Sequence, residues 1–175
     1  MGMTKANHTG GGLPHEPRLA LALRTLLSNQ RVAALGTLGP GGHPFVSMVP
    51  FAIDNRSGTV VIHVSGLAPH TRNLKASSKV SLMVMQAEVA GESVHALPRV
   101  TLEGTAAVIP PDSPMWISAR TAYLQRFPEA EPMTELEDFR FVDIDLESAH
   151  QVAGFGAART LDADALAQIM KPSEG

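Results

Sequence analysis

Strand-like apolar segments follow one another along most of the chain, and turn residues separate them. They predict strands over residues 31–38, 44–53, 59–64, 79–85, 99–109 and 138–146, and the last of these alternates apolar and polar residues. In the last of these, Val142, Ile144 and Leu146 share one face, and Asp143 and Asp145 share the other. This division predicts strands that turn one face towards a core and the other towards solvent.

Helical periodicity interrupts the strand pattern near the start, the middle and the end of the chain. Residues 16–30 place leucines at helical spacing, which predicts an amphipathic helix. A helix over residues 69–76 opens with proline, whose missing N–H costs nothing at the first helical position. Ser113 and Pro114 supply an N-cap and a first residue for another helix, and residues 162–170 predict a short C-terminal one.

Strands that follow one another as a meander, with helices at the start, middle and end, argue for a small antiparallel barrel. Strands and helices do not alternate strictly, which disfavours a doubly wound parallel sheet. We therefore predict a mainly β (α+β) fold, a split barrel of six or seven antiparallel strands with flanking helices. Residues 15–175 form a single domain in this interpretation, and the glycine-rich, polar residues 1–14 are predicted to be disordered. The glutamate-rich stretch 129–137 is predicted to be a solvated loop.

Composition and charge exclude several classes of function. The 175-residue chain has a net charge of −3, which gives no overall attraction to nucleic acids or acidic membranes. It has no cysteine, so disulfides and thiolate chemistry are excluded, and zinc would have only histidine and carboxylate ligands. No apolar run approaches the thickness of a bilayer, and no signal peptide is recognisable, so we expect a cytoplasmic protein.

Candidate chemistry is concentrated in residues 63–74. This segment predicts a buried strand that passes through a Ser-Gly turn into the helix that starts at Pro69. The first turn of that helix carries an imidazole, a hydroxyl, a guanidinium and an amide, on His70, Thr71, Arg72 and Asn73. Cations there oppose the helix dipole unless an anion lies between them and the free backbone N–H groups. A phosphate is the natural candidate, and a merely solvated helix face is the alternative.

Several ordered blocks of sequence resemble one known family. Gly41-Gly-His-Pro-Phe-Val-Ser-Met-Val-Pro50, the segment 63–74 and Leu97-Pro-Arg-Val-Thr-Leu-Glu-Gly104 are similar to the pyridoxamine 5′-phosphate oxidase-like FMN-binding split barrels. The closing Val152-Ala-Gly-Phe-Gly-Ala157, together with His-Thr-Arg-Asn-Leu, resembles more narrowly the haem-utilisation branch of that superfamily. The resemblance covers residues 18–159. It implies a homodimeric split barrel with two FMN sites at the subunit interface.

The resemblance also implies where the flavin lies. The ring follows the strand at residues 47–51, where backbone groups meet its polar edge and Met48 and Val49 supply apolar contact. Pro50 cannot donate to a ladder, so it belongs at an edge or a bulge. Arg72 is the charge-assisted donor to the phosphate, and Asn73 either joins it or braces the turn. The implied cofactor-binding residues are Ser47, Met48, Val49, Pro50, His63, Val64, Ser65, His70, Thr71, Arg72, Asn73 and, on the partner subunit, Arg99.

Some conspicuous residues have a purely structural interpretation beside the functional one. His63 is as much a packed barrel residue as a ligand contact, and Arg99 could be a plain edge-strand charge. Trp116 is interpreted as core or dimer packing, and the methionine-rich residues 82–85 as core packing. Phe155, between two glycines, is interpreted either as the plug of a hinge loop or as part of the flavin pocket.

The haem-utilisation branch implies a histidine near the C-terminus as the iron ligand. No histidine follows His150 in this chain, so an axial role would fall to His150 or to a residue elsewhere. A solvent-exposed histidine at the end of a strand is the alternative interpretation. We expect no other metal ligand.

Three hypotheses follow for the function. The first is an FMN-binding oxidoreductase, in which the flavin supplies the redox chemistry and the protein positions it. The second is a haem-binding or haem-degrading protein that uses the same barrel without flavin, and the third is a cofactor-free dimeric scaffold. In each case we expect a homodimer that binds neither nucleic acid nor a membrane, and the first two hypotheses imply a small-molecule cofactor and substrate. An absorption spectrum separates the three, because flavin absorbs in the blue and haem has a Soret band.

Overall fold

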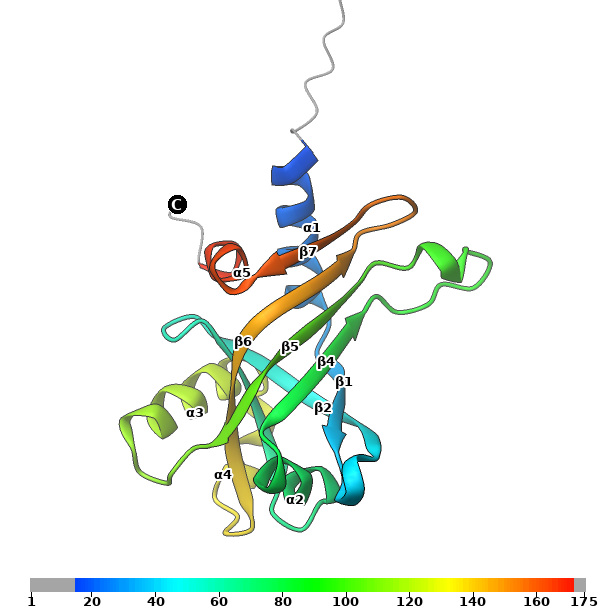
Figure 1. Cartoon of the computed structure of the whole chain (residues 1–175). Helices are drawn as coiled ribbons and strands as arrows, with labels where there is room; N and C mark the ends of the chain where they lie inside the picture. The colour runs from blue at the N-terminus through cyan, green and yellow to red at the C-terminus, as the bar shows by residue number, and fades with distance from the viewer. Residues whose placement is uncertain (1–14, 172–175) are drawn as a thin grey trace, which may run out of the picture.

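Seven antiparallel strands and five α-helices make up residues 15–171, the part of the chain that the computed structural model describes (Figure 1). The strands are β1 (Val32–Leu38), β2 (Pro44–Asp54), β3 (Thr59–Ser65), β4 (Lys79–Met85), β5 (Arg99–Val108), β6 (Phe139–Val152) and β7 (Ala158–Asp162). The α-helices are α1 (His15–Asn29), α2 (Pro69–Ala76), α3 (Pro114–Arg126), α4 (Glu131–Thr134) and α5 (Ala163–Met170). Short 3₁₀ turns are η1 (Pro40–Gly42), η2 (Val94–Ala96) and η3 (Pro128–Ala130). The segment predicted to be disordered, 1–14, lies outside the described residues.

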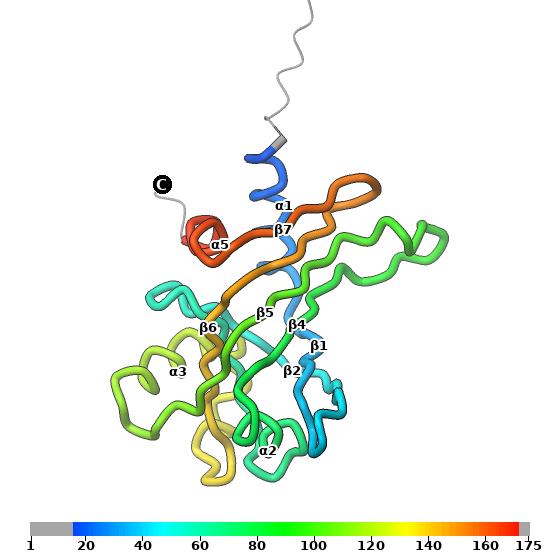
Figure 2. The backbone as a smooth tube through the Cα atoms, in the orientation of Figure 1, coloured from blue at the N-terminus to red at the C-terminus, as the bar shows by residue number. Residues whose placement is uncertain are grey.

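Six of these strands close into a barrel. Hydrogen-bonded neighbours follow the order β3-β2-β1-β4-β5-β6-β7, and β3 also pairs with β6, which closes the ring. The β3–β6 register runs from Val60 opposite Ile144 to Ser65 opposite Phe139. β7 pairs with β6 outside the ring, and the β4–β5 and β6–β7 connections both project past the barrel (Figure 2). The predicted antiparallel barrel with flanking helices is therefore confirmed.

β6 is longer than the sequence pattern predicts, and the pattern does not predict β7. β6 continues to Val152, beyond the predicted end at Leu146. A register shift between β5 and β6 at Gly104 changes the phase of β6, so that the inward position after Leu146 is Ala149 and not Ser148. Gly104 suits this bulge because a Cβ atom there would lie 2.2 Å from the carbonyl oxygen of Asp145. The bulge interrupts the alternation of apolar and polar residues on which the prediction depends.

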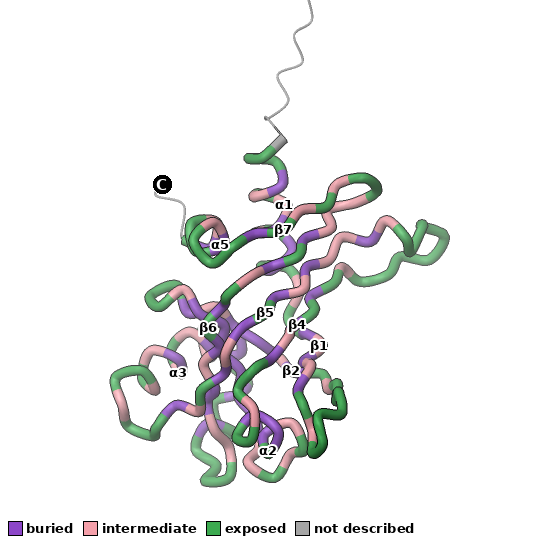
Figure 3. The backbone as a smooth tube through the Cα atoms, in the orientation of Figure 1, coloured by how far each residue is buried: buried purple, intermediate pink, exposed green. Residues whose placement is uncertain are grey.

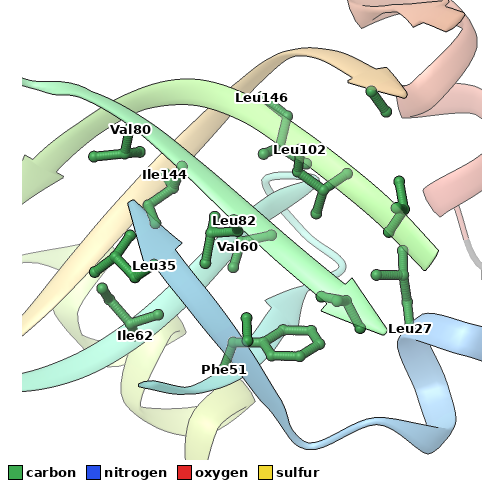
Figure 4. Packing of buried hydrophobic residues seen from close by; sticks show 14 of the residues in the cluster. Leu27, Leu35, Phe51, Val60, Ile62, Val80, Leu82, Leu102, Ile144 and Leu146 are labelled. Atoms are coloured by element: carbon green, nitrogen blue, oxygen red, sulfur yellow. The ribbon is translucent and has the colours of Figure 1, made fainter. Parts of the chain in front are cut away.

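The barrel interior holds the main hydrophobic core. Its largest side chains come from all six strands of the ring and are almost fully buried: Leu35, Phe51, Ile62, Leu82, Leu102 and Ile144 (Figure 4). Leu23 and Leu27 of α1 and Leu166 of α5 belong to the same cluster. Buried backbone segments follow the strands through the barrel in Figure 3. Removal of this apolar surface from water is the main force that stabilises the fold.

A second hydrophobic cluster lies outside the barrel, beneath α3. It joins Ala52 of β2, Val61 of β3 and Phe141 of β6 to the buried face of α3, and Trp116 packs against it. The rings of Trp116 and Phe141 meet edge-on, with centroids 5.9 Å apart. Trp116 therefore packs within the subunit.

The stretch predicted as a solvated loop, 129–137, contains the short helix α4, and its glutamates are exposed.

Candidate cofactor site

Strands β2 and β3 diverge at one end of the barrel. β2 pairs with β1 as far as Pro50, and pairs with β3 only from Phe51 onwards. β3 in turn leaves β2 after Ile62. In the described structure, no strand lies along the second edge of β2 over residues 44–50. Pro50 thus lies where the ladder changes partner, which suits a residue that cannot donate an N–H.

Helix α2 covers this end of the barrel and contacts β1, β2 and β5. Asn73 Nδ2 donates to Thr37 Oγ1 of β1 at 3.0 Å, and Thr71 Oγ1 donates to the Ser65 carbonyl of β3 at 2.6 Å. The side chains of Thr71 and Asn73 are both buried. These two residues brace α2 against the barrel, so their polar groups are already satisfied inside the fold.

His70 also turns towards the barrel. Its Nδ1 lies 3.1 Å from Ser47 Oγ of β2, and its Nε2 is buried with no partner among the described residues. Burial lowers the pKa of His70, so the ring is mainly neutral at pH 7 and supplies no charge for an anion. We call the three pairs His70–Ser47, Thr71–Ser65 and Asn73–Thr37 the α2 plug.

Arg72 is the member of this quartet that faces outward. It is exposed, and its Nη1 donates to the Leu67 carbonyl at 3.2 Å. It lines an open groove of about 750 Å³ between α2 and the β1–β2 turn, together with His43 and Phe45. The structure therefore divides the predicted phosphate site: three side chains bond to the strands as the plug, and the guanidinium is left on the groove, which Asn73 also lines. Ser65, one of the implied cofactor-binding residues, donates its Oγ hydrogen to Asp138 Oδ2 at 3.1 Å.

His63 lies on the outer side of β3, in the cluster beneath α3. Its ring centroid is 4.4 Å from that of Phe141, 5.1 Å from that of Phe139 and 5.6 Å from that of Tyr123. It is 6% exposed, its Nδ1 has no partner among the described residues, and burial lowers its pKa to about 4. Val64 points the other way, into the main core. These two residues therefore pack inside the subunit and do not line the groove beside Arg72.

The outer side of β1, β2 and β4 carries exposed apolar side chains around a shallow groove of about 360 Å³. We call this surface the outer apolar face, and its members are Val32, Ala34, Val46, Met48, Met83 and Met85. Exposed fractions of 66% for Met48 and 67% for Val46 are high for apolar side chains. Of the two residues predicted to contact the flavin ring, Met48 is exposed on this face, whereas Val49 is buried in the barrel core. Residues 82–85, interpreted as core packing, divide in the same way: Leu82 and Val84 are buried, and Met83 and Met85 face out.

Strand register extends this face across the sheet. One row of paired residues crosses β2, β1, β4, β5, β6 and β7: Met48, Ala34, Met83, Thr101, His150 and Thr160. In the next row, Arg99 of β5 lies between Met85 and Val152. Paired residues on neighbouring strands point to the same side of a sheet, so His150 and Arg99 share the outer side with the methionines.

Arg99 and Phe155 have different surroundings from each other. Arg99 is half-buried, and its Nη1 donates to the Leu97 carbonyl at 3.0 Å. Phe155 lies in the β6–β7 turn and is 92% exposed, so it fills neither a hinge nor a pocket within the described subunit. The row that joins His150 to Met83 cannot be predicted from the sequence pattern, because the bulge changes the phase of β6.

Two further properties concern the described residues as a whole. None of the helices in residues 15–171 is both long and apolar enough to cross a membrane. That part of the chain also has no cluster of three or more histidine and acidic side chains that could hold a bare metal ion.

Known proteins with similar sequences include two heme oxygenases. The chain is 29% identical over 159 residues to Heme oxygenase HutZ of Vibrio cholerae, which covers 90% of this chain and 89% of HutZ. It is 33% identical over 138 residues to the chloroplastic heme oxygenase HOZ of Arabidopsis thaliana, which covers 78% of this chain. The aligned region spans only 40% of the length of HOZ.

Solved structures agree with the fold and lead to the family. A heme-binding protein from Mycobacterium smegmatis superposes with a TM-score of 0.76 at 29% identity, over 86% of this chain and 60% of that one. The heme storage protein HutZ from Vibrio cholerae superposes with a TM-score of 0.68 at 26% identity, over 77% of this chain and 92% of that one. The family model described as pyridoxamine 5′-phosphate oxidase matches residues 19–153. The chain therefore belongs to the pyridoxamine 5′-phosphate oxidase family.

Proposed function

We propose that this protein binds haem on the outer apolar face and takes part in haem utilisation, in the cytoplasm and as a homodimer. The observation that carries the proposal is the outer apolar face itself, an exposed sheet surface rich in methionine side chains. Beside it, the same row of the sheet continues with the polar residues Thr101, His150 and Thr160. The names of its relatives support haem as the ligand: two are heme oxygenases, and others are a heme-binding and a heme storage protein.

The chemistry of the face suits a porphyrin. A flat apolar macrocycle buries its surface against valine and methionine side chains such as Val46, Met48 and Met83. The carboxylates of a porphyrin need a cation at their edge, and Arg99 lies in the row next to these methionines. Bound haem supplies the redox and oxygen chemistry of its iron, while the residues of this chain bind it, orient it and exclude water.

A second copy of the chain would cover this face. Exposed apolar patches on a sheet mark interaction sites, and isologous dimers use the same patch twice. A ligand between two such faces would be shielded from water on both sides. The dimer that the sequence analysis expects is thus part of the proposal. An absence of cysteine is compatible with the cytoplasm, where disulfides are rare.

Flavin is the second candidate cofactor, and the exposed Arg72 is the observation that favours it. Its groove is open to a phosphate, and the family model is named for an enzyme with a phosphorylated substrate. Arg72 alone supports FMN less strongly than the outer apolar face supports haem, because the α2 plug already uses the other polar groups of the quartet.

Separate titrations of the purified protein with hemin and with FMN test the proposal. We expect hemin to develop a saturable Soret band, and Met48→Asp to weaken hemin binding at least tenfold because it puts a charge on the apolar face. Met115→Asp on α3 is the matched control, since Met115 is 55% exposed outside this face. If only FMN binds, and Arg72→Ala weakens FMN more than riboflavin by roughly 1.5–3 kcal/mol, the flavin function replaces the haem function.

A further inference from the structure

We propose that a pocket beside the first residues of β6 binds a free aromatic amino acid, with its ring against Trp116 and Phe139 and its two charges at Arg140 and Glu137. We call it the Trp116 pocket. It has a volume of about 410 Å³, and the other side chains that line it are Pro111, Thr134 and Leu136. It shares no lining residue with the groove beside Arg72 or with the outer apolar face, so this inference is independent of the proposed haem function.

Two segments of the chain, 111–116 and 134–140, form the Trp116 pocket. Trp116 lies in the first turn of α3, Thr134 is the last residue of α4, and Phe139 is the first residue of β6. Both helices contact β6, and their places beside the start of that strand can be followed in Figure 1. The pocket therefore arises from the way in which α3 and α4 pack on the barrel.

Both aromatic walls of the pocket are held by packing inside the subunit. Trp116 meets Phe141 edge-on with ring centroids 5.9 Å apart, and Phe139 packs against His63 at 5.1 Å. His63 in turn lies 4.4 Å from Phe141, so the four rings form one continuous cluster. The walls are thus already ordered before a ligand arrives, which reduces the entropic cost of binding.

The lining of the pocket favours a ligand with one aromatic ring. Trp116 and Phe139 are half-buried, so part of each ring remains accessible at the pocket. An aromatic ligand gains edge-to-face or offset contacts with such rings in addition to the apolar area that it buries. Pro111 and Leu136 extend the apolar lining. The volume is at the lower end of the range for small-molecule sites, which suits a single ring rather than a macrocycle.

The polar groups of the pocket carry one charge of each sign. Arg140 is half-buried, and its Nη1 donates to the carbonyls of Glu137 and, at 2.6 Å, of Phe139. Neither the Arg140 guanidinium nor the Glu137 carboxylate has an ion-pair partner among the described residues. A purely anionic ligand would meet the carboxylate as well as the guanidinium, and a purely cationic ligand would meet the guanidinium. The carboxylate and ammonium groups of an amino acid match both charges.

Titration of the full chain with L-phenylalanine tests the proposal. Trp116 is the single tryptophan of the chain, so its emission, excited where phenylalanine does not absorb, reports on the pocket. We expect a saturable change in this emission, and calorimetric titration should give the same affinity. Hydrocinnamate lacks the ammonium group and phenethylamine lacks the carboxylate. Each should bind about tenfold more weakly, because it loses one charge-assisted hydrogen bond. L-Alanine, which lacks the ring, should not bind.

Two charge variants should differ in which ligand they discriminate. Arg140→Gln should weaken L-phenylalanine about tenfold and leave phenethylamine unchanged, and Glu137→Gln should weaken L-phenylalanine about tenfold and leave hydrocinnamate unchanged. Arg140→Lys keeps the positive charge and should retain most of the affinity, which separates the loss of charge from a rearranged loop. Arg56→Gln and Glu92→Gln are matched controls, because both residues are exposed outside this pocket. They should leave every affinity unchanged.

Three results would overturn the proposal. The first is that L-phenylalanine changes neither the emission nor the heat of titration. The second is that hydrocinnamate or phenethylamine binds as tightly as L-phenylalanine, which would leave no role for one of the two charges. The third is that Arg140→Gln and Glu137→Gln both keep the wild-type selectivity, which would place the ligand elsewhere on the chain. Hemin binding, measured separately, bears on the proposed function and not on this pocket.

Discussion

At the scale of single residues, His63 shows how packing among aromatic rings keeps an imidazole uncharged. Three aromatic rings surround it, its Nδ1 has no partner among the described residues, and its pKa is lowered to about 4 by burial. The unfolded chain exposes the same imidazole to water, where its pKa is near 6.5. The folded state therefore binds a proton less readily than the unfolded state.

Acid should destabilise the protein through this residue. Above pH 6.5 His63 is neutral in both states and contributes no pH dependence. As the pH falls from 6.5 to about 4, the imidazole of His63 takes up a proton in the unfolded state but stays mainly neutral in the native state. This difference lowers the free energy of unfolding by on the order of 3 kcal/mol. Urea denaturation at several pH values should show a smaller loss over this interval for His63→Phe than for the wild type.

His95→Phe is the control for that experiment, because His95 is exposed. Its pH dependence should match that of the wild type. Parallel stability curves for His63→Phe and the wild type would show that the ring of His63 is hydrated in solution.

At the scale of elements, α2 illustrates what neighbouring positions of one helix can do. Asn73 is buried and donates to Thr37, whereas Arg72, one position earlier, is exposed. The helix begins at Pro69, which suits the first helical position, and ends where the Ser77 N–H bonds to the Asn73 carbonyl. One side of the helix closes the barrel, and the other lines the groove with the β1–β2 turn.

Substitutions on the two sides should differ in their effect on stability. Asn73→Ala removes the amide that satisfies Thr37 and should lower the free energy of unfolding by about 1–3 kcal/mol. Arg72→Ala should change it by less than about 0.5 kcal/mol. The double variant Asn73→Ala/Thr37→Val should recover part of the loss, because both polar partners are then absent. Chemical denaturation measures all three, and equal losses for the single variants would contradict the plug.

The success of the sequence analysis also varies from element to element. Residues 69–76 and 79–85 are predicted with the bounds that α2 and β4 have, because proline and regular alternation mark them. The predicted end of β6 is wrong because a bulge shifts the phase of the strand. In addition, the buried Gln151 occupies an inward position at which the alternating pattern would have an apolar residue. Gln151 is accommodated by its hydrogen bond to the Leu19 carbonyl, a contact between distant segments that no local pattern contains.

The candidate site was less accessible to sequence reasoning than the fold. The two-residue period of a strand puts His63 and Val64 on opposite sides of β3, but which side could meet a ligand depends on where α3 packs. The outer apolar face likewise joins β1 and β2 to β4, which β3 and α2 separate from them along the chain. Only their register shows that Met48 and Met83 lie in one row.

At the scale of the whole molecule, the outer apolar face sets the expected assembly. Its apolar side chains lie on three adjacent strands. The exposed Met115 and Ile117, by contrast, both lie on the single helix α3. A continuous apolar sheet surface is costly to leave in water and promotes self-association.

The dimer can be tested without a cofactor. Val46→Lys places a charge on the face, where Val46 is 67% exposed, and should convert a dimer into a monomer, which light scattering after size exclusion measures directly. Ile117→Lys is the matched control, because Ile117 is 58% exposed on α3. A wild-type protein that is monomeric at micromolar concentration would contradict the proposed assembly.

The pairing of β3 with β6 also governs the order of events during folding. Thr59 and Asp143, joined by a hydrogen bond between these strands, are 84 positions apart along the chain. Proteins dominated by such distant contacts fold slowly, in milliseconds to seconds, because the loop must close before the contacts form. During synthesis β3 must wait, with one edge unpaired, until β6 has left the ribosome. The barrel is thus most vulnerable to aggregation while its chain is still growing.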